Sequence, residues 1–189
     1  ITEARNVLKE GVSQTDQLKN LSDSLLELNH LNQNGSSFNI QPVSIKTLIN
    51  ESFKKVKAKA DEKKIIIKSK SVPAKISVDS QKIEEALIII LDNAIKYSPE
   101  SSTVKLIAIN TKRKIIFKII DQGMGISQKD LPHIFDRFYR ADNARTKNGT
   151  TGYGLGLSIA QKIIEQHHGS ISVQSTIKKG TTFIISLPR

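Results

Sequence analysis

The sequence contains no cysteine and no tryptophan, and aromatic residues make up only 5% of its 189 positions. The absence of cysteine excludes disulfides and thiolate metal ligands and fits a reducing compartment. No apolar run approaches the roughly 18–20 residues of a membrane-spanning helix, and no signal peptide opens the chain. Because the first residue is Ile1 rather than methionine, we expect a piece of a longer polypeptide, with any membrane anchor in a missing N-terminal part.

Basic residues outnumber acidic ones by 29 to 18, which gives a formal net charge of +11. A basic face could bind nucleic acid or anionic lipid. The lysines are spread along the chain, however, and no groove-reading motif or interleaved aromatic residue accompanies them. We therefore predict a lysine-rich solvated surface and no nucleic-acid partner.

The first 33 residues contain no proline and predict one long helix. Four leucines follow one another at intervals of three, four and three, which is heptad spacing. A narrow apolar stripe of this kind predicts partner helices, from an upstream segment or a second subunit. The alternative is a helix that packs on its own domain. The four leucines are Leu18, Leu21, Leu25 and Leu28.

Residues 34–41 open with Asn-Gly-Ser-Ser and predict a linker, followed by an independent domain over 42–189. Apolar periodicity predicts three helices, the middle one capped by Asp79, and mostly hairpin-linked strands. Helices on one face of a mixed sheet give an α+β fold, a two-layer α/β sandwich. The helices are expected over 44–61, 80–96 and 155–167, the strands over 64–70, 75–78, 103–110, 114–120, 170–175 and 181–187, and a short helix after the capping-box sequence 127–130.

Two glycine clusters, 121–126 and 152–157, bracket a segment rich in Asn, Thr, Lys and Arg. Glycine lets the backbone approach a phosphate closely. The second cluster precedes an apolar helical pattern, so its free N–H groups and the helix dipole favour an anion. A hinged cover over a polyphosphate ligand is the first hypothesis.

Four motifs occur in order: Leu-Asp-Asn-Ala-Ile-Lys-Tyr at 91–97, Asp-x-Gly-x-Gly from Asp121, Phe-Asp-Arg-Phe-Tyr-Arg at 135–140, and Gly-x-Gly-x-Gly from Gly152. Together they resemble the catalytic ATP-binding domain of sensor histidine kinases. That fold is shared with type II topoisomerase, mismatch-repair and heat-shock chaperone ATPases. The leading helix resembles the second helix of the family's dimerisation and phosphoacceptor hairpin.

The resemblance implies a site for ATP and Mg²⁺. Asn93 would hold Mg²⁺ through its amide oxygen, although it could instead bond the helix end. Asp121 would pair its partly buried carboxylate with the adenine amino group; the alternative is a turn or cap residue. Arg140 and Arg137 would be catalytic by steadying the γ-phosphate. The remaining nucleotide-binding residues that the resemblance implies are Lys96, Tyr97, Gly123, Gly125, Gly152, Gly154, Leu155, Gly156 and Thr181.

Other roles stay open at this stage. Lys96 and Tyr97 could be surface residues rather than phosphate and adenine contacts. Phe135 and Phe138 could be ordinary core residues or, as the resemblance implies, could dock the lid onto the phosphoacceptor helices.

Two positions depart from the family pattern. The family places a second asparagine four residues before Asn93, and this sequence has Ile89 there, which removes one expected Mg²⁺ contact. None of the four histidines is followed closely by an acidic residue and a proline, as the phosphoacceptor would be. The acceptor helix is therefore expected upstream of Ile1.

The hypothesis is the cytoplasmic catalytic part of a membrane-anchored sensor histidine kinase. It would transfer the γ-phosphoryl group of ATP to a histidine on the missing helix, for relay to an aspartate of a response regulator receiver domain. The full-length protein would be a homodimer through its helical hairpin. The alternatives are a degenerate non-catalytic scaffold, which Ile89 supports, a topoisomerase-like ATPase stimulated by DNA, and a nucleic-acid binder without ATP chemistry.

Overall fold

The computed structural model describes residues 38–141 and 153–189, together with most positions of a helical segment between 11 and 31. The predicted start of the linker at 34–37 and the glycine at Gly152 lie outside the described residues. Within the part that is described, no helix is both long and apolar enough to cross a membrane.

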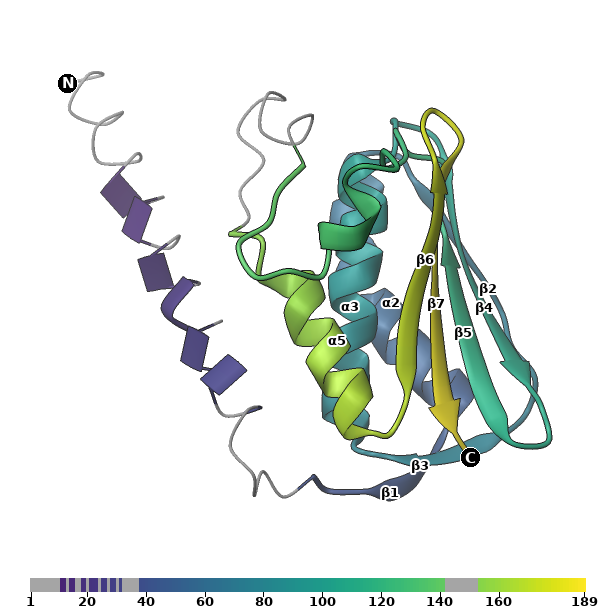
Figure 1. Ribbon diagram of the computed structural model, residues 1–189. Helices are drawn as coiled ribbons and strands as arrows, with labels where there is room; N and C mark the ends of the chain where they lie inside the picture. Colours follow the sequence, from purple (N-terminus) through teal and green to yellow (C-terminus); the bar gives the residue numbers. More distant parts are fainter. Residues whose placement is uncertain are drawn as a thin grey trace.

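A five-stranded mixed sheet forms one layer of the domain (Figure 1). Its strand order is β2-β4-β5-β7-β6, in which β2 runs parallel to β4 and the other neighbours are antiparallel. The alternation of buried and exposed residues along β4 and β5 shows that one face of the sheet is covered. The strands are β2 Ile66–Lys70, β4 Thr103–Asn110, β5 Lys114–Ile120, β6 Ser170–Thr176 and β7 Gly180–Pro188.

Three helices cover that face and leave the other face open (Figure 1). Their buried positions recur at helical spacing, and they enclose the core with β-branched and leucine side chains of the sheet. This arrangement confirms the predicted two-layer α+β fold. The observed helix boundaries lie within one or two residues of the predicted ones. The helices are α2 Ile45–Glu62, α3 Ser80–Tyr97 and α5 Gly156–Gln166, and the short helix after residue 130 is the 3₁₀ turn η1 Leu131–His133.

A small second sheet was not predicted. β1 Gln41–Ser44 pairs antiparallel with β3 Lys75–Val78, so Ser44 is at once the end of a strand and the residue before α2. Pro42 concealed this strand, because proline cannot donate a ladder hydrogen bond and is confined to edge positions.

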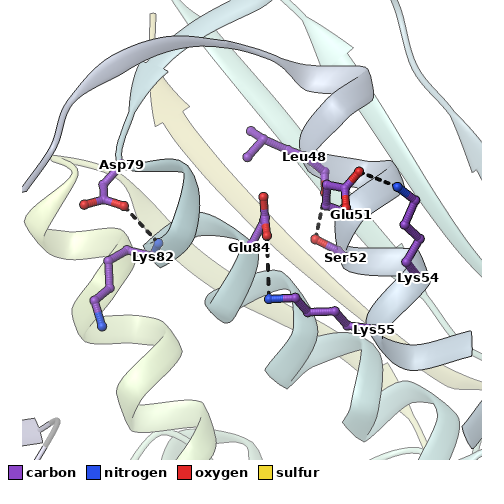
Figure 2. Close-up of polar contacts among 8 residues, drawn as sticks. All are labelled: Leu48, Glu51, Ser52, Lys54, Lys55, Asp79, Lys82 and Glu84. Carbon is purple, nitrogen blue, oxygen red and sulfur yellow. Dashed lines mark hydrogen bonds and ion pairs between the residues drawn. The ribbon is translucent and has the colours of Figure 1, made fainter.

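Polar contacts fix the start of α3 and its packing on α2 (Figure 2). The carboxylate of Asp79 accepts a hydrogen bond from the backbone N–H of Lys82 at 3.1 Å, which confirms the predicted cap. Ser52 is fully buried, and its hydroxyl donates to a carbonyl one turn earlier in α2. Lys55 of α2 lies 3.9 Å from Glu84 of α3, and burial raises the pKa of Glu84 while Lys55 opposes the rise.

The leucine stripe of the leading helix divides into two sets. Leu28 and the following Leu31 are buried, and Leu21 packs against the same core. Leu18 and Leu25, by contrast, are 72% and 43% exposed. Part of the stripe therefore packs on the chain's own domain, which was the alternative interpretation, and the other part remains available to a partner helix.

Leu31, at the end of this helix, and Phe38 both contact the C-terminal end of α5. Gln166 donates from its side chain to the carbonyl of Leu31, and the ring of Phe38 lies 4.8 Å from the ring of His167. His167 in turn accepts a hydrogen bond from the backbone N–H of Asp79 at its Nε2 atom. Burial lowers the pKa of His167, so this histidine is neutral and structural.

Candidate functional site

A cavity of about 970 Å³ opens between the last turn of α3, the segment after β5, the start of α5 and the β6–β7 turn. This volume is within the range of small-molecule sites, and polar and apolar side chains both line it. The structure brings together residues that are far apart in the sequence. The predicted site residues that line the cavity are Asn93, Lys96, Tyr97, Asp121, Gly125, Arg140, Gly154, Gly156 and Thr181.

Asp121 is the best-defined polar group in the cavity. Its side chain is buried, and Oδ1 accepts hydrogen bonds from the backbone N–H of Gly123 at 2.7 Å and of Thr181 at 3.0 Å. The described residues provide no hydrogen-bond partner for Oδ2. Burial raises the pKa of Asp121, and the two backbone donors oppose the rise. A carboxylate held in this way presents one acceptor oxygen to a ligand that carries an N–H group.

Gly123 makes this arrangement sterically possible, although it does not line the cavity itself. A Cβ atom at this position would lie 2.8 Å from the carbonyl oxygen of Tyr97 and 2.9 Å from Oδ1 of Asp121. The turn after β5 therefore approaches the end of α3 more closely than any other residue would allow. The role of Gly123 is to support the carboxylate.

Positive charge is concentrated at the end of α3. Lys96 is half-buried, and its pKa is lowered first by burial and then by the neighbouring positive charge of Arg140. Its ammonium also lies 5.3 Å from the centre of the Tyr97 ring. Burial raises the pKa of the Tyr97 hydroxyl, while Arg140 opposes this effect. The carboxylate of Asp92 acts on Lys96 in the opposite sense to Arg140. Two cations that line one cavity attract anions, so this part of the cavity suits phosphate groups.

Oxygen donors lie next to these cations. Asn93 lines the cavity, and so does the preceding residue, Asp92, whose Oδ2 pairs with Lys59. The other carboxylate oxygen, Oδ1 of Asp92, is buried and has no hydrogen-bond partner among the described residues. Amide and carboxylate oxygens are the ligands of Mg²⁺, which usually takes one or two from the protein and the rest from water and phosphates. The donor set therefore fits this ion, although Ile89 contributes no oxygen.

The second glycine cluster contacts the Phe-rich motif. Gly154 has a φ of +73°, and a Cβ there would lie 2.6 Å from the carbonyl oxygen of Tyr139. The backbone N–H of Phe138 donates to the Gly154 carbonyl at 3.0 Å. The two phenylalanines of the motif differ: Phe135 packs edge-on against Phe183 of the core, whereas Phe138 is 57% exposed.

Three other residues predicted for the site differ in what surrounds them: Leu155 and Gly156 pack closely, whereas Arg137 is exposed. Leu155 is buried at the start of α5, and its carbonyl accepts from the hydroxyl of Ser158. A Cβ on Gly156 would lie 3.2 Å from the side chain of Ile89, so Ile89 packs against the second glycine cluster. Arg137 is exposed and does not line the cavity.

Lys63 is a residue that the sequence did not single out. Its ammonium donates to the carbonyls of Ile95, Lys96 and Ser98 at 2.8–2.9 Å. These are acceptors that the end of α3 leaves without intrahelical partners. Lys63 thus fixes the turn that carries Lys96 and Tyr97. In the sequence it is one of several lysines on a helix, and only the tertiary contact distinguishes it.

Comparison with known proteins is consistent with this site. Residues 78–189 match the family model described as histidine kinase-, DNA gyrase B- and HSP90-like ATPase. Over 116 residues, or 61% of the chain and 25% of the relative, the sequence is 43% identical to the signal transduction histidine-protein kinase ArlS of Staphylococcus epidermidis (strain ATCC 12228 / FDA PCI 1200). Over 188 residues, or 99% of the chain and 32% of the relative, it is 33% identical to the sensor protein SrrB of Staphylococcus aureus (strain N315).

The chain thus spans about a quarter to a third of the length of these relatives. Its fold is also similar to that of the Acinetobacter baumannii histidine kinase AdeS, with a TM-score of 0.79 at 24% identity. That similarity covers 96% of this chain and 83% of the other.

Proposed function

Because the chain belongs to the histidine kinase-, DNA gyrase B- and HSP90-like ATPase family, we propose that the cavity binds ATP with Mg²⁺ for phosphoryl transfer to a protein histidine. The observation that carries this proposal is the buried carboxylate of Asp121. Two backbone donors hold its Oδ1, and the cavity that Asp121 lines is also lined by the cations Lys96 and Arg140. A buried acceptor and two cations in one cavity match an adenine base and a triphosphate.

Each group has a defined task in this proposal. Oδ2 of Asp121 accepts a hydrogen bond from the adenine amino group, while Lys96 and Arg140 attract the phosphates. Asn93 and Asp92 supply oxygen donors for Mg²⁺, which neutralises charge on the phosphates when bound. Catalysis then consists mainly of positioning and electrostatic stabilisation.

The acceptor and partners belong to the full-length protein. The two relatives are named a histidine-protein kinase and a sensor protein. We therefore place the acceptor histidine on a helix upstream of residue 1, and we assign the next acceptor to an aspartate of a response regulator receiver domain. The exposed Leu18 and Leu25 are available for homodimerisation through a helical hairpin. The domain would act at the cytoplasmic side of a membrane-anchored sensor.

Phosphoryl transfer in trans tests the proposal. The chain is incubated with γ-labelled ATP and Mg²⁺, either alone or with a fragment of the full-length protein that contains the upstream helix. We expect acid-labile phosphohistidine on the helix fragment, none on the chain alone, and none when Asp121→Asn replaces the wild type. Phosphohistidine on the chain alone, or ATP hydrolysis that DNA stimulates, would contradict it.

A second candidate is a non-catalytic nucleotide-binding scaffold of the same fold. Ile89 favours it, because an apolar side chain lines the cavity beside the proposed metal donors. In the same assay this candidate predicts nucleotide binding without any transfer to the helix fragment.

A further inference from the structure

The open face of the sheet has an unusual composition. Antiparallel sheets with one solvated face normally alternate apolar residues inward and polar residues outward. Here the outward positions of the sheet carry six isoleucines that are exposed or half-buried and that do not belong to the core cluster. Two of them, Ile66 and Ile109, are 53% and 36% exposed. The others are Ile107, Ile116, Ile120 and Ile184.

Lysines occupy most of the remaining outward positions of β2, β4 and β5, whereas the outward positions of β6 and β7 are mainly serine and threonine. The register places Lys68 of β2 beside Lys105 of β4, and the next row contains Lys70, Ile107 and Lys118. Figure 1 shows that none of the helices in the described part of the chain covers this face. Among the described residues, no acidic or aromatic side chain lies at an outward position of the five strands. We call this surface the Ile–Lys face; its lysines are Lys68, Lys70, Lys105, Lys114 and Lys118.

Structural explanations account for only part of this surface. Lysines on an edge strand discourage edge-to-edge aggregation, which would explain Lys68 and Lys70 on β2. Lys105 and Lys118, however, lie on the internal strands β4 and β5. Like charges at directly opposite positions destabilise a sheet, and Lys68 and Lys105 are such a pair. None of the five lysines forms an ion pair with any residue that the structure describes.

We propose that the Ile–Lys face is a docking surface for an anionic phospholipid bilayer. The charges are distributed in two dimensions over three neighbouring strands, which suits a planar polyanion better than a single acidic peptide. Lysine side chains can reach the headgroups while isoleucines enter the boundary with the acyl chains. The face has no aromatic platform on which nucleic-acid bases could stack.

This orientation is compatible with nucleotide binding. The cavity is built from the helices, the segments beside them and the β6–β7 turn, and none of the five lysines lines it. The proposal is therefore independent of the proposed function, and the two can fail separately.

Vesicle binding tests the proposal with the whole 189-residue chain. Co-sedimentation is measured with vesicles of phosphatidylcholine alone and with about one third phosphatidylserine. The test variant is Lys68→Gln/Lys105→Gln/Lys118→Gln. The control variant removes the same charge from exposed positions of α2, as Lys46→Gln/Lys54→Gln/Lys57→Gln. Each protein is also melted with an ATP analogue, to show that the fold and the cavity persist.

We expect the chain to bind the anionic vesicles only, and this binding should weaken as the salt concentration rises. Each lysine at an anionic surface contributes about a fivefold change in partition, so the test variant should bind about 100-fold more weakly. The control variant should change by less than about fivefold. At unchanged charge, Ile66→Thr/Ile109→Thr should also lower binding several-fold.

Three outcomes would overturn the proposal. The first is no preference for anionic vesicles, and the second is an equal loss in the test and control variants, which would indicate net charge alone. The third is binding to DNA or polyglutamate without binding to vesicles, which would assign the face to an acidic macromolecule.

Discussion

Replacing Asp121 by asparagine separates ligand recognition from folding. The amide oxygen can still accept from the backbone N–H groups of Gly123 and Thr181, whereas the group that faces the cavity changes from an acceptor to a donor. A hydrogen bond to a charged partner is worth about 1.5–3 kcal/mol, so the dissociation constant of an ATP analogue should rise by about 10–150-fold.

The size of the effect follows from binding linkage. Ligand at about 100 times its Kd adds about 2.7 kcal/mol to the free energy of unfolding, which corresponds to about 5–10 °C for a domain of this size. After a 100-fold loss of affinity the same concentration adds about 0.4 kcal/mol, or about 1 °C.

Without ligand, Asp121→Asn should not lower the melting temperature. Because burial raises the pKa of Asp121, the folded state takes up a proton more readily than the unfolded state. The ionised carboxylate therefore costs stability once the pH has risen above the folded pKa. Asp121→Asn should melt at an equal or higher temperature than the wild type at neutral pH without ligand.

Differential scanning fluorimetry with and without the analogue measures both effects. Asp61→Asn, which removes an exposed carboxylate on α2, serves as the control and should keep the full ligand shift. A ligand shift in Asp121→Asn as large as in the wild type would refute the assignment of this carboxylate.

Three further predictions concern other residues. Lys63→Met removes the cation from three carbonyls, so it should lower the free energy of unfolding, measured in urea, by about 2–3 kcal/mol. It should also weaken nucleotide binding. Unchanged binding at reduced stability would limit Lys63 to a structural role. In a metal titration, Ile89→Asn should increase the Mg²⁺ affinity of the nucleotide complex about tenfold. Ile89→Val serves as the control. No gain in affinity would show that an oxygen at this position does not reach the metal. The pKa of His167 is lowered by burial, so the stability that its neutral form provides is present above the unfolded pKa of about 6.5 and is lost as the pH falls through the window below it. Urea midpoints should therefore fall more steeply below about pH 6.5 in the wild type than in His167→Gln, and equal slopes would contradict this.

Periodic patterns made most of the fold predictable. The apolar positions of α3 recur at helical spacing, and Asp79 before it is a cap that needs only local sequence. The motif residues Asp121 and Lys96 could be predicted to lie at one site because of the family resemblance, and the structure brings them to one cavity.

Tertiary contacts explain what the sequence did not show. The three hydrogen bonds of Lys63 join residues more than thirty positions apart, and nothing near Lys63 in the sequence indicates them. The leucine stripe was ambiguous for a similar reason, because Leu21 and Leu28 find partners in the chain's own core while Leu18 and Leu25 do not.

The two donors that hold Asp121 have a consequence for sequence drift. Both are main-chain N–H groups, so the donor at position 181 does not depend on the chemistry of the side chain, provided that the residue is not proline and fits a buried position. At position 123 the nearby carbonyl of Tyr97 restricts the choice to glycine. In a library of all single substitutions, selection for nucleotide binding should thus tolerate several small residues at 181 and almost none at 121 and 123.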